Sequence, residues 1–509
     1  MLAKTYGMSV FGVSAALITI ETNVAQGSKC FLVGLPDSTI KESIQRVESA
    51  IKQMGGFFPR RKVIINLAPA NIRKEGSAYD LPIALSLMHA SEQVEMPTLP
   101  HFVIMGELAL DGVLRPIKGA LAMVMEAQKQ GFTKLILPRE NATEAAMIQG
   151  MEVYGMETLS ETVLFLRGKT IHKPFPTTQT STHSYDDGLD FAHVRGQKIA
   201  KRAFEIAAAG GHNLLLIGPP GAGKTMLAKR ISSILPPLTL EEAMETTKIH
   251  SVAGKILQNS QLIAQRPFRS PHHSISSTAL IGGGSNPQPG EISLAHNGVL
   301  FLDELPEFSR HALEVMRQPL EDHHVLISRA KWSIDFPANF MLIDSMNPCP
   351  CGYFNHPTKD CTCGQEVVKR YLNKISGPLL DRIDLHIEVS PVAFEEIRSP
   401  DMAEASAIIR ERVIAARNRQ QTRFRNYPEV HANAGMTSQL VGLFCPLQTE
   451  AETLLQQAMK RLQLSARAYE RILKVARTIA DLAGTPEIEP NHMAEAITYR
   501  NLDRENWAG

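Results

Sequence analysis

The sequence lacks any long apolar run. None of its hydrophobic stretches approaches the roughly 18–20 residues that cross a bilayer as a helix. The apolar stretch near the N-terminus contains Gly7 and Gly12, alternates β-branched residues and runs into Glu21-Thr22-Asn23. This pattern favours paired strands over a signal peptide. We therefore expect a cytoplasmic protein with no membrane partner.

An excess of charge of either sign is also missing. The 53 Lys and Arg residues nearly balance the 52 Asp and Glu residues, which leaves a net charge of +1. No global field therefore draws the chain to nucleic acid. Any such binding must use a local basic surface, or a surface repeated around a ring of subunits.

The length of 509 residues is too great for one hydrophobic core and predicts two or three domains of a mainly α/β chain. Short strands alternate with helical stretches over residues 1–168. Residues 169–188 are rich in Thr, Ser, Pro and His and read as a linker. An α/β pattern fills 189–390, and 391–509 shows the three- and four-residue apolar spacing of helices.

A complete phosphate-binding loop opens the α/β segment. The apolar strand Leu214–Ile217 leads into Gly218, Pro219, Pro220, Gly221, Ala222, Gly223, Lys224 and Thr225, and then into a helical pattern. Glycines allow backbone N–H groups to close around phosphate oxygens. We expect Lys224 to neutralise β- and γ-phosphate charge and Thr225 to offer its hydroxyl to Mg²⁺. ATP and Mg²⁺ are the implied cofactors.

Two acids follow the next apolar strand, in GVLFLDELPEF. A parallel strand that ends in Asp303-Glu304 brings both carboxylates to the nucleotide crevice. We expect Asp303 to hold Mg²⁺ and Glu304 to polarise the attacking water. Alone, the pair would also fit a strand that ends in two solvated acids.

Three further residues complete a set that acts on nucleotide. Asn347 ends another buried strand, where a side chain can orient water near the γ-phosphate. Arg382 precedes a strand and Arg467 begins a helix in the lid. An arginine that reaches a neighbour's nucleotide supplies transition-state charge, and one in the lid of the same chain senses it. Either arginine alone would be read as part of a surface salt bridge.

The ordered set of phosphate loop, Asp-Glu, Asn, Arg and lid Arg resembles the AAA+ ATPases. RPFRSPHHSIS, MNPCPCG and SGPLLDRID further resemble the magnesium-chelatase-like AAA+ proteins of the YifB/ComM branch, and this resemblance extends over nearly the whole chain. It implies a homo-hexamer, because the arginine finger acts in trans. It also implies a motor that drives branch migration of DNA during natural transformation, with recombination proteins as candidate partners.

The N-terminal segment resembles the Lon-type proteases without their catalytic pair. In KEGSAYD, Ala78 stands where the nucleophilic serine would be, and Ser77 lies one position early. In PIKGAL, Leu121 stands in the place of the catalytic lysine, and Lys118 lies three positions early. A serine nucleophile needs a base within hydrogen-bond reach. We predict a Lon-like α+β domain that is inactive as a protease and serves either as an oligomer scaffold or as a DNA contact.

Two insertions in the core are candidates for DNA contact. Residues 274–291 form a Gly-rich stretch, and 323–336 alternate apolar and polar residues around a tip that holds Arg329, Lys331 and Trp332. In related motors both insertions point into the central pore, so six tips would make a basic collar for branched, single- or double-stranded DNA. Trp332 fits either base stacking or packing within the hairpin.

A helix rich in arginine follows in the lid, in IIRERVIAARNRQQTRFR. It carries six arginines and a single acid, Glu411. Arg410 shares a helix face with Arg417, and Arg412 shares one with Arg419. A solvated lid face, a subunit contact and a DNA-phosphate patch all fit this pattern.

Only six cysteines occur, which excludes a disulfide scaffold. Four of them cluster as Cys349-x-Cys351 and Cys361-x-Cys363 within an insertion, 349–363. Two close thiol pairs across a Gly/Pro/Asn loop predict a structural Zn²⁺ site, with His356 as a possible replacement ligand. Reduced loop cysteines without metal are the alternative.

Three other activities remain open from the sequence. One is an ATP-dependent protease or unfoldase, against which Ala78 and Leu121 argue. Another is the ATPase subunit of a chelatase that inserts metal into a porphyrin, in which we would not expect a Lon-like domain. The third is a regulatory ring whose nucleotide state recruits a partner.

Overall fold

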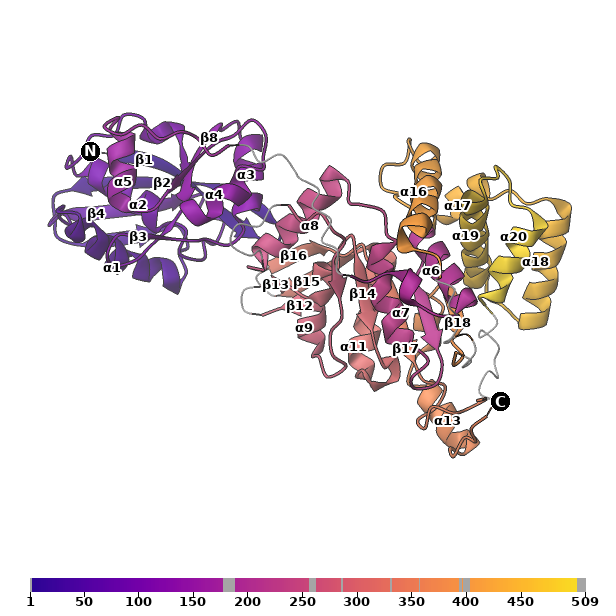
Figure 1. Ribbon diagram of the computed structural model, residues 1–509. Helices are drawn as coiled ribbons and strands as arrows, with labels where there is room; N and C mark the ends of the chain where they lie inside the picture. Colours follow the sequence, from indigo (N-terminus) through magenta and orange to yellow (C-terminus); the bar gives the residue numbers. More distant parts are fainter. Residues whose placement is uncertain are drawn as a thin grey trace.

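Three parts follow one another along the chain. The computed structural model describes residues 2–176, 188–255, 262–284, 287–329, 332–356, 358–392, 396 and 403–500. Figure 1 shows a sheet domain at the N-terminal end, an α/β core in the middle and a helical lid beyond it. The predicted α/β class with a C-terminal helical lid is confirmed. In the part of the chain that the structure describes, no helix is long and apolar enough to cross a membrane.

The N-terminal domain is built on a mixed seven-stranded sheet with the order β3-β4-β2-β1-β5-β8-β9. Strand β2 pairs antiparallel with both β1 and β4, and the other neighbours are parallel. The strands of this domain are β1 Leu2–Phe11, β2 Ser14–Ala25, β3 Cys30–Val33, β4 Lys62–Ala68, β5 Val103–Ile104, β8 Lys134–Pro138 and β9 Glu152–Met156, with a separate ribbon of β6 Glu107–Leu108 and β7 Leu114–Arg115.

Helices cover both faces of this sheet. In β4, Val63, Ile65 and Leu67 are buried at every second position, as expected for a strand with one face on a core. They join one apolar cluster with α1, α2 and α5, whereas α3 and α4 contribute to a second cluster. The helices are α1 Ser38–Gln53, α2 Asp80–Ala90, α3 Ala120–Lys129, α4 Arg139–Ala145 and α5 Leu159–Leu166, with a 3₁₀ turn η1 at Leu99–His101.

The core contains a five-stranded, all-parallel sheet with the order β11-β14-β17-β10-β18. Every described side chain of β10, β14 and β17 is buried, which is typical of a parallel sheet with helices on both faces. The strands are β10 Leu214–Ile217, β11 Phe268–Arg269, β14 Val299–Leu302, β17 Met341–Met346 and β18 Leu385–Glu388. The carboxyl ends of β10, β14 and β17 therefore meet along one edge.

Helices and two small ribbons surround the core sheet. The ribbons are β12 Gly282–Gly283 with β13 Gln288–Pro289, and β15 His324–Arg329 with β16 Trp332–Pro337. The helices are α6 Lys198–Gly210, α7 Lys224–Arg230, α8 Leu240–Val252, α9 Ser277–Ile281, α10 Glu291–Leu294, α11 Arg310–Val315, α12 Arg317–Asp322, α13 Gln365–Leu372 and α14 Gly377–Leu380, with 3₁₀ turns η2 Phe191–His193, η3 Ile231–Ser233 and η4 Leu305–Glu307. The predicted hairpin over 323–336 thus forms one residue later.

The N-terminal domain packs against the core at the base of this hairpin. Val13, in the turn between β1 and β2, belongs to the same apolar cluster as Ile327 and Phe336 of β15 and β16. A Cβ added at Gly12 would clash with Ile334 Cγ2, so the Gly12 backbone lies close against that side chain. Ser251 of α8 donates its hydroxyl to Glu144. The two domains are therefore joined by apolar packing and by a buried hydrogen bond.

The lid is a bundle of helices that shares an apolar cluster with α6 of the core. Its helices are α16 Ser406–Arg423, α17 Ser438–Phe444, α18 Thr449–Leu462, α19 Ala466–Ala483 and α20 Pro490–Thr498, with a 3₁₀ turn η5 at Asn433–Gly435. In α19, Ile472, Val475, Ala476 and Ile479 are buried at the spacing of one helix face. The side-chain hydroxyl of Ser465 caps the first turn by accepting from the Ala468 N–H.

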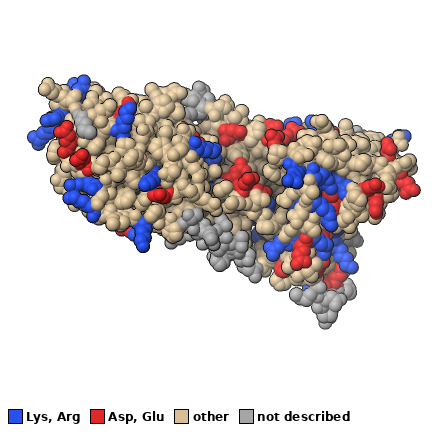
Figure 2. All heavy atoms as spheres, turned by 90° about the horizontal axis from the view of Figure 1, so that it is seen from above, with Lys and Arg blue, Asp and Glu red and all other residues tan. Residues whose placement is uncertain are grey.

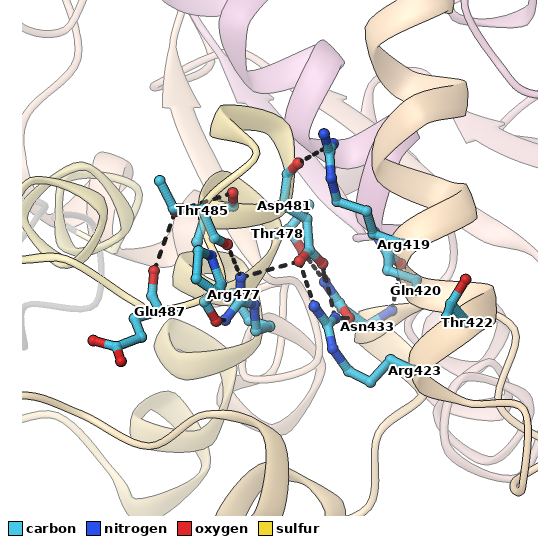
Figure 3. A network of polar contacts seen from close by, with 12 residues as sticks. Arg419, Gln420, Thr422, Arg423, Asn433, Arg477, Thr478, Asp481, Thr485 and Glu487 are labelled. Atoms are coloured by element: carbon cyan, nitrogen blue, oxygen red, sulfur yellow. Dashed lines mark hydrogen bonds and ion pairs between the residues drawn. The ribbon is translucent and has the colours of Figure 1, made fainter.

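A polar network lies inside the lid (Figure 3). Asp481 is 1% exposed and accepts hydrogen bonds from Arg423 Nη1 and Asn433 Nδ2, each at 2.8 Å. Arg477 Nη2 lies 3.1 Å from the same carboxylate, and Gln420 Oε1 accepts from the Asn433 N–H at 3.0 Å. A buried carboxylate must be paired to remain charged, and the partners of Asp481 come from several elements. The bonds therefore join α16, η5 and α19.

Candidate nucleotide-binding site

The phosphate-binding loop connects β10 to α7 at the carboxyl edge of the core sheet. Gly221 and Gly223 have φ angles of 80° and 89°, which glycine adopts without strain. Lys224 is buried, and its ammonium group donates to Gly218 O at 2.6 Å and to Asn347 Oδ1 at 3.0 Å. Burial lowers the pKa of Lys224, against the opposing effect of the carboxylates of Asp303 and Glu304. The structure thus brings the predicted lysine and asparagine together.

The hydroxyl of Thr225 meets the carboxylate at the end of β14. Thr225 Oγ1 donates to Asp303 Oδ2 at 2.7 Å, and Ser345 Oγ donates to Asp303 Oδ1. Hydroxyl and carboxylate oxygens are the ligands that Mg²⁺ prefers, together with phosphate oxygens and water. The sequence analysis missed Ser345. Its only signal was a hydroxyl two residues before Asn347 at the end of a buried strand.

Glu304 lies beside Asp303 but points to a different partner. Its φ angle is 56°, and its side chain is 57% exposed. Its carboxylate lies opposite His273, whose Nδ1 is 3.6 Å from Glu304 Oε2. His273 has no predicted role from its motif, RPFRSPHHSIS.

The two predicted arginines lie at the other end of the core sheet. Arg382 forms an ion pair with Glu321, and its backbone oxygen accepts from Asn213, the residue before β10. Arg467 is exposed in the first turn of α19, and its charge helps to lower the pKa of Glu321 behind the stronger effect of Arg382. Both arginines therefore lie around Glu321, towards the amino end of the strands.

This position differs from the expectation that a lid arginine senses the nucleotide of its own chain. Helix α19 is fixed to the amino edge of the sheet by a buried set of bonds. His212 forms two hydrogen bonds, one between Nδ1 and Asp384 Oδ2 at 3.1 Å and one between Nε2 and Thr478 Oγ1 at 2.8 Å. Arg471 forms an ion pair with Asp384. Because these contacts direct the first turn of α19 towards Glu321, the structure does not bring Arg467 to Lys224.

The four clustered cysteines converge on one point in the segment that follows Asn347. Their sulfur atoms all lie within 4.8 Å of one another, and Cys349 Sγ is 3.3 Å from Cys351 Sγ and 3.7 Å from Cys361 Sγ. Thiolates at tetrahedral Zn²⁺ distances would be about 3.8 Å apart, so this set fits a Cys₄ zinc site. His356 is not part of it, because its Nδ1 accepts from the backbone of Thr358 and Lys359.

Three profiles of one protein family match most of the chain. They are magnesium chelatase, subunit ChlI, over residues 190–397, subunit ChlI of Mg-chelatase over 20–141, and the ChlI C-terminal domain over 403–500. The chain belongs to the magnesium chelatase family.

Relatives within this family match the chain from end to end. YifB of Escherichia coli K12, described as an uncharacterized protein, is 45% identical over 507 residues, which cover 99% of this chain and 98% of YifB. The competence protein ComM of Haemophilus influenzae is 44% identical over 509 residues, again 99% and 98% of the two chains. The chain is thus a YifB/ComM-type member, and family and site together support an AAA+ ATPase that uses ATP and Mg²⁺.

A partial match to a Lon protease accompanies these relatives. A Lon protease of Koribacter versatilis is 25% identical over 159 residues, 28% of this chain and 19% of that protease. Leu121, at the position of the lysine, is fully buried in an apolar cluster that also holds Ala78. Ser77 contacts Glu107, and the Lys118 side chain lies against Gly254 of the core. The structure therefore forms no serine–lysine pair among these positions.

The arginine-rich helix α16 is tied largely into its own chain. Arg412 pairs with Glu205 and Glu404, Arg417 donates to Ala208 O at 2.9 Å, and Arg419 donates to Asp481 O at 2.7 Å. Figure 2 shows that basic side chains gather over the lid end of this face, intermixed with acidic ones. Bonds within the lid and to the core therefore account for four of these arginines, namely Arg412, Arg417, Arg419 and Arg423. The other two, Arg410 and Arg425, are exposed.

The predicted DNA contacts at the hairpin tip fall outside the described side chains. Arg329 pairs with Trp332 in the backbone register of β15 and β16. Lys331 and the side chains of Arg329 and Trp332 are not described. Their contact with DNA stays a prediction.

Proposed function

We propose that this protein is a ring-forming AAA+ ATPase that moves along DNA and promotes branch migration. In this proposal Lys224 holds the β- and γ-phosphates, Asn347 orients the attacking water and Glu304 accepts its proton. Thr225 and Asp303 hold Mg²⁺, which, when bound, neutralises charge that develops between the phosphates. The convergence of Lys224 with Asn347, and of Thr225 with Asp303, is the observation that carries the hydrolytic part.

The contacts of Lys224 indicate what the phosphates of ATP would replace. Its ammonium group bonds Gly218 O, Pro219 O and Asn347 Oδ1, and all three partners are neutral oxygens. Phosphate oxygens carry full negative charge and form stronger charge-assisted hydrogen bonds. ATP binding therefore exchanges these contacts for phosphate and frees the Asn347 amide for water.

The position of the arginines supports a homo-oligomer. Arg382 and Arg467 lie around Glu321, away from Lys224 in the same chain, although transition-state charge needs a cation near the γ-phosphate. A second copy packed head to tail would bring these arginines to the phosphate loop of its neighbour, and such heterologous contacts close into rings. We propose a homo-hexamer.

The DNA part of the proposal rests on the core insertions and on the ComM relative. A Cβ added at Gly282 would lie 3.1 Å from Ile327 Cδ1, so the 274–291 insertion lies against the β15–β16 hairpin. Two insertions that touch in each subunit would form adjacent rings along a central pore. Since ComM is named a competence protein, we propose action on branched DNA during natural transformation, in the cytoplasm and alongside recombination proteins.

The test is ATP-dependent branch migration on three-stranded and forked DNA, with Glu304→Gln as the hydrolysis-deficient control. We expect the wild type to displace the strand and to hydrolyse ATP faster with DNA, and the variant to do neither. If DNA is neither moved nor able to stimulate hydrolysis, the DNA function fails. ATP-dependent unfolding of a polypeptide and activity with porphyrin and partner subunits would then be assayed.

We also propose that the cysteine cluster holds structural Zn²⁺. The Phe354 N–H donates to Cys349 Sγ at 3.3 Å, a contact that stabilises a thiolate. The cluster follows Asn347 by two residues, so loss of metal would loosen a water-orienting side chain. Metal analysis should give one zinc per chain, and Cys361→Ser should lower the bound zinc and reduce kcat severalfold with a smaller change in KM. Full activity in a metal-free preparation would contradict this assignment.

A further inference from the structure

A cavity of about 620 Å³ lies between the core and the lid. Its core wall includes Asn213, Gly298 and Met341, which lie at the amino ends of β10, β14 and β17. Its lid wall includes side chains of α16 and α19 and most of the segment 429–437 between α16 and α17. Because the phosphate-binding loop leaves β10 at its carboxyl end, this cavity lies at the opposite edge of the sheet from the candidate nucleotide site.

The guanidinium group of Arg417 lines this cavity from α16. Its Nη1 donates to His431 O at 3.2 Å and its Nη2 to Ala208 O at 2.9 Å, and its Nε is buried without a hydrogen-bond partner. In the part of the chain that the structure describes, no carboxylate forms an ion pair with it. Burial lowers the pKa of Arg417 to about 10. A cation withdrawn from water in this way favours an anion that can pair with it.

The ammonium group of Lys474 lines the same cavity from α19. It donates to Ala434 O at 3.0 Å, and it too forms no ion pair among the residues that the structure describes. Burial lowers its pKa, against the opposing effect of the Asp384 carboxylate. Lys474 therefore resembles Lys224 of the phosphate-binding loop, whose ammonium group also bonds neutral oxygen atoms.

The acidic residues around the cavity do not neutralise these two cations. Two of the five, Asp322 and Glu429, are exposed, so water and salt screen their charge. The other three already form ion pairs, namely Glu242 with Arg266, Glu321 with Arg382 and Asp384 with Arg471. Arg417 and Lys474 thus provide positive charge on the lid wall of the cavity.

The core wall is apolar where the lid wall is charged. Phe340 and Met341 are buried beside the cavity, and Leu320 of α12 lines it as well. A volume of about 620 Å³ is within the range of sites for small organic ligands and far exceeds what one inorganic ion fills. A guanidinium and an ammonium group together suit a phosphate group, with which they form charge-assisted hydrogen bonds.

We propose that this cavity binds a small organic phosphate. Arg417 and Lys474 hold the phosphate group, and the organic part lies against Phe340 and Met341. Such a ligand joins the lid to the core, because its charged end is bound by α16 and α19 and its apolar end by the amino edge of the core sheet. This inference depends neither on ATP hydrolysis nor on DNA.

The test measures the binding of inorganic phosphate and of AMP by titration calorimetry in a Lys224→Ala background. That substitution weakens the phosphate-binding loop, and AMP lacks the β- and γ-phosphates that the loop holds. We expect both probes to bind, AMP more tightly because its organic part also contacts the apolar wall.

Three further substitutions in this background locate the binding. Arg417→Met and Lys474→Met each keep an aliphatic stem, and each should weaken AMP binding about tenfold or more through the loss of a hydrogen bond between charged groups. Arg419→Met is the matched control on α16, because Arg419 donates to Asp481 O outside the cavity. It should bind AMP with unchanged affinity.

The outcomes decide each part of this inference. If neither probe binds, or if Arg417→Met and Lys474→Met leave the affinity for AMP unchanged, the site is overturned. If AMP binds no more tightly than phosphate, the cavity takes an adventitious ion only, and the organic ligand is overturned. Thermal unfolding without ligand checks the fold, and Lys474→Met carries the test if Arg417→Met does not fold. ATP hydrolysis in the chain with Lys224 intact is a separate measurement, so failure of this site leaves the ATPase unaffected.

Discussion

The core and the N-terminal domain of this protein differ in the catalytic residues that they contain. The core brings its phosphate loop into contact with Asp303 and Asn347, whereas the N-terminal domain resembles the Lon-type proteases without their serine and lysine. In the N-terminal domain the positions of the missing pair are filled by Ala78 and Leu121, which pack into an apolar cluster. Backbone architecture is stabilised by such packing and does not depend on catalytic side chains.

Replacing one lysine in the core and one in the N-terminal domain tests this difference most directly. Lys224→Ala should reduce kcat/KM for ATP by about a thousandfold or more, because the positive charge that this lysine brings to the negatively charged transferred phosphate is lost. Lys118→Ala should leave ATP hydrolysis close to wild type, since that lysine contacts Gly254 and no nucleotide residue. Steady-state hydrolysis at saturating Mg²⁺ measures both. A large loss in Lys118→Ala would show that the N-terminal domain takes part in catalysis.

Restoring a lysine at the Lon-like position should damage stability. Leu121→Lys places an ammonium group in a fully buried apolar cluster and should cost about 3 kcal/mol in the N-terminal domain. Leu121→Met, which conserves volume, should cost less than about 1.5 kcal/mol. Urea unfolding followed by hydrogen exchange in α3 reports this domain. A near-neutral Leu121→Lys would mean that the new lysine pairs with the buried carboxylate of Glu144.

The buried carboxylate of Asp384, at the junction of core and lid, should make the free energy of unfolding depend on pH. Burial acts to raise the pKa of Asp384, but Arg471 and His212 outweigh it and hold the pKa well below its usual value. The contribution of this charged carboxylate to the free energy of unfolding is fully present above the pKa of an aspartate in the unfolded chain, about 3.9. It is lost progressively as the pH falls below that value. Asp384→Asn should therefore cost about 3 kcal/mol at pH 7 and less at pH 3.

A second buried aspartate provides the matched control. Asp344 is fully buried, and burial raises its pKa well above the usual value, which favours its uncharged form. Asp344→Asn should then change the free energy of unfolding by less than about 1 kcal/mol at pH 7. Equal losses in the two variants would contradict the difference in charge state.

A smaller effect on catalysis than that of Lys224→Ala is expected at Ser345, which supports Asp303 from β17. Ser345→Ala removes one hydrogen bond to a charged oxygen, worth about 1.5 kcal/mol, and should lower kcat about tenfold. The concentration of Mg²⁺ needed for half-maximal activity should rise, because Asp303 is less firmly oriented. An unchanged Mg²⁺ dependence would limit Ser345 to a structural role.

Local motifs were enough to predict the parts of the site that belong to single strand ends. Lys224, Asp303 and Asn347 each follow an apolar strand, and parallel strands bring such positions to one edge. The cysteine cluster was predictable for a similar reason, since its two pairs are close in sequence and thiols have few other uses in this pattern.

The remaining features depend on contacts between distant segments. The place of Arg467 is set by bonds of α19 to His212 and Asp384, and nothing in the helix itself encodes that direction. The contact of His273 with Glu304 joins residues from different strands, and the bond between Ser251 and Glu144 crosses a domain boundary. Only the three-dimensional fold brings these partners together.

The close approach of Gly12 to Ile334 affects how a force on the β15–β16 hairpin is transmitted to the rest of the protein. Val13 beside it packs with Ile327 and Phe336, so the hairpin is braced at its base by the N-terminal domain as well as by the core. A load applied at the tip is then shared between two folded bodies. The N-terminal domain is thus a mechanical support for the hairpin, and any side chain larger than that of glycine at residue 12 would clash with Ile334 at this support.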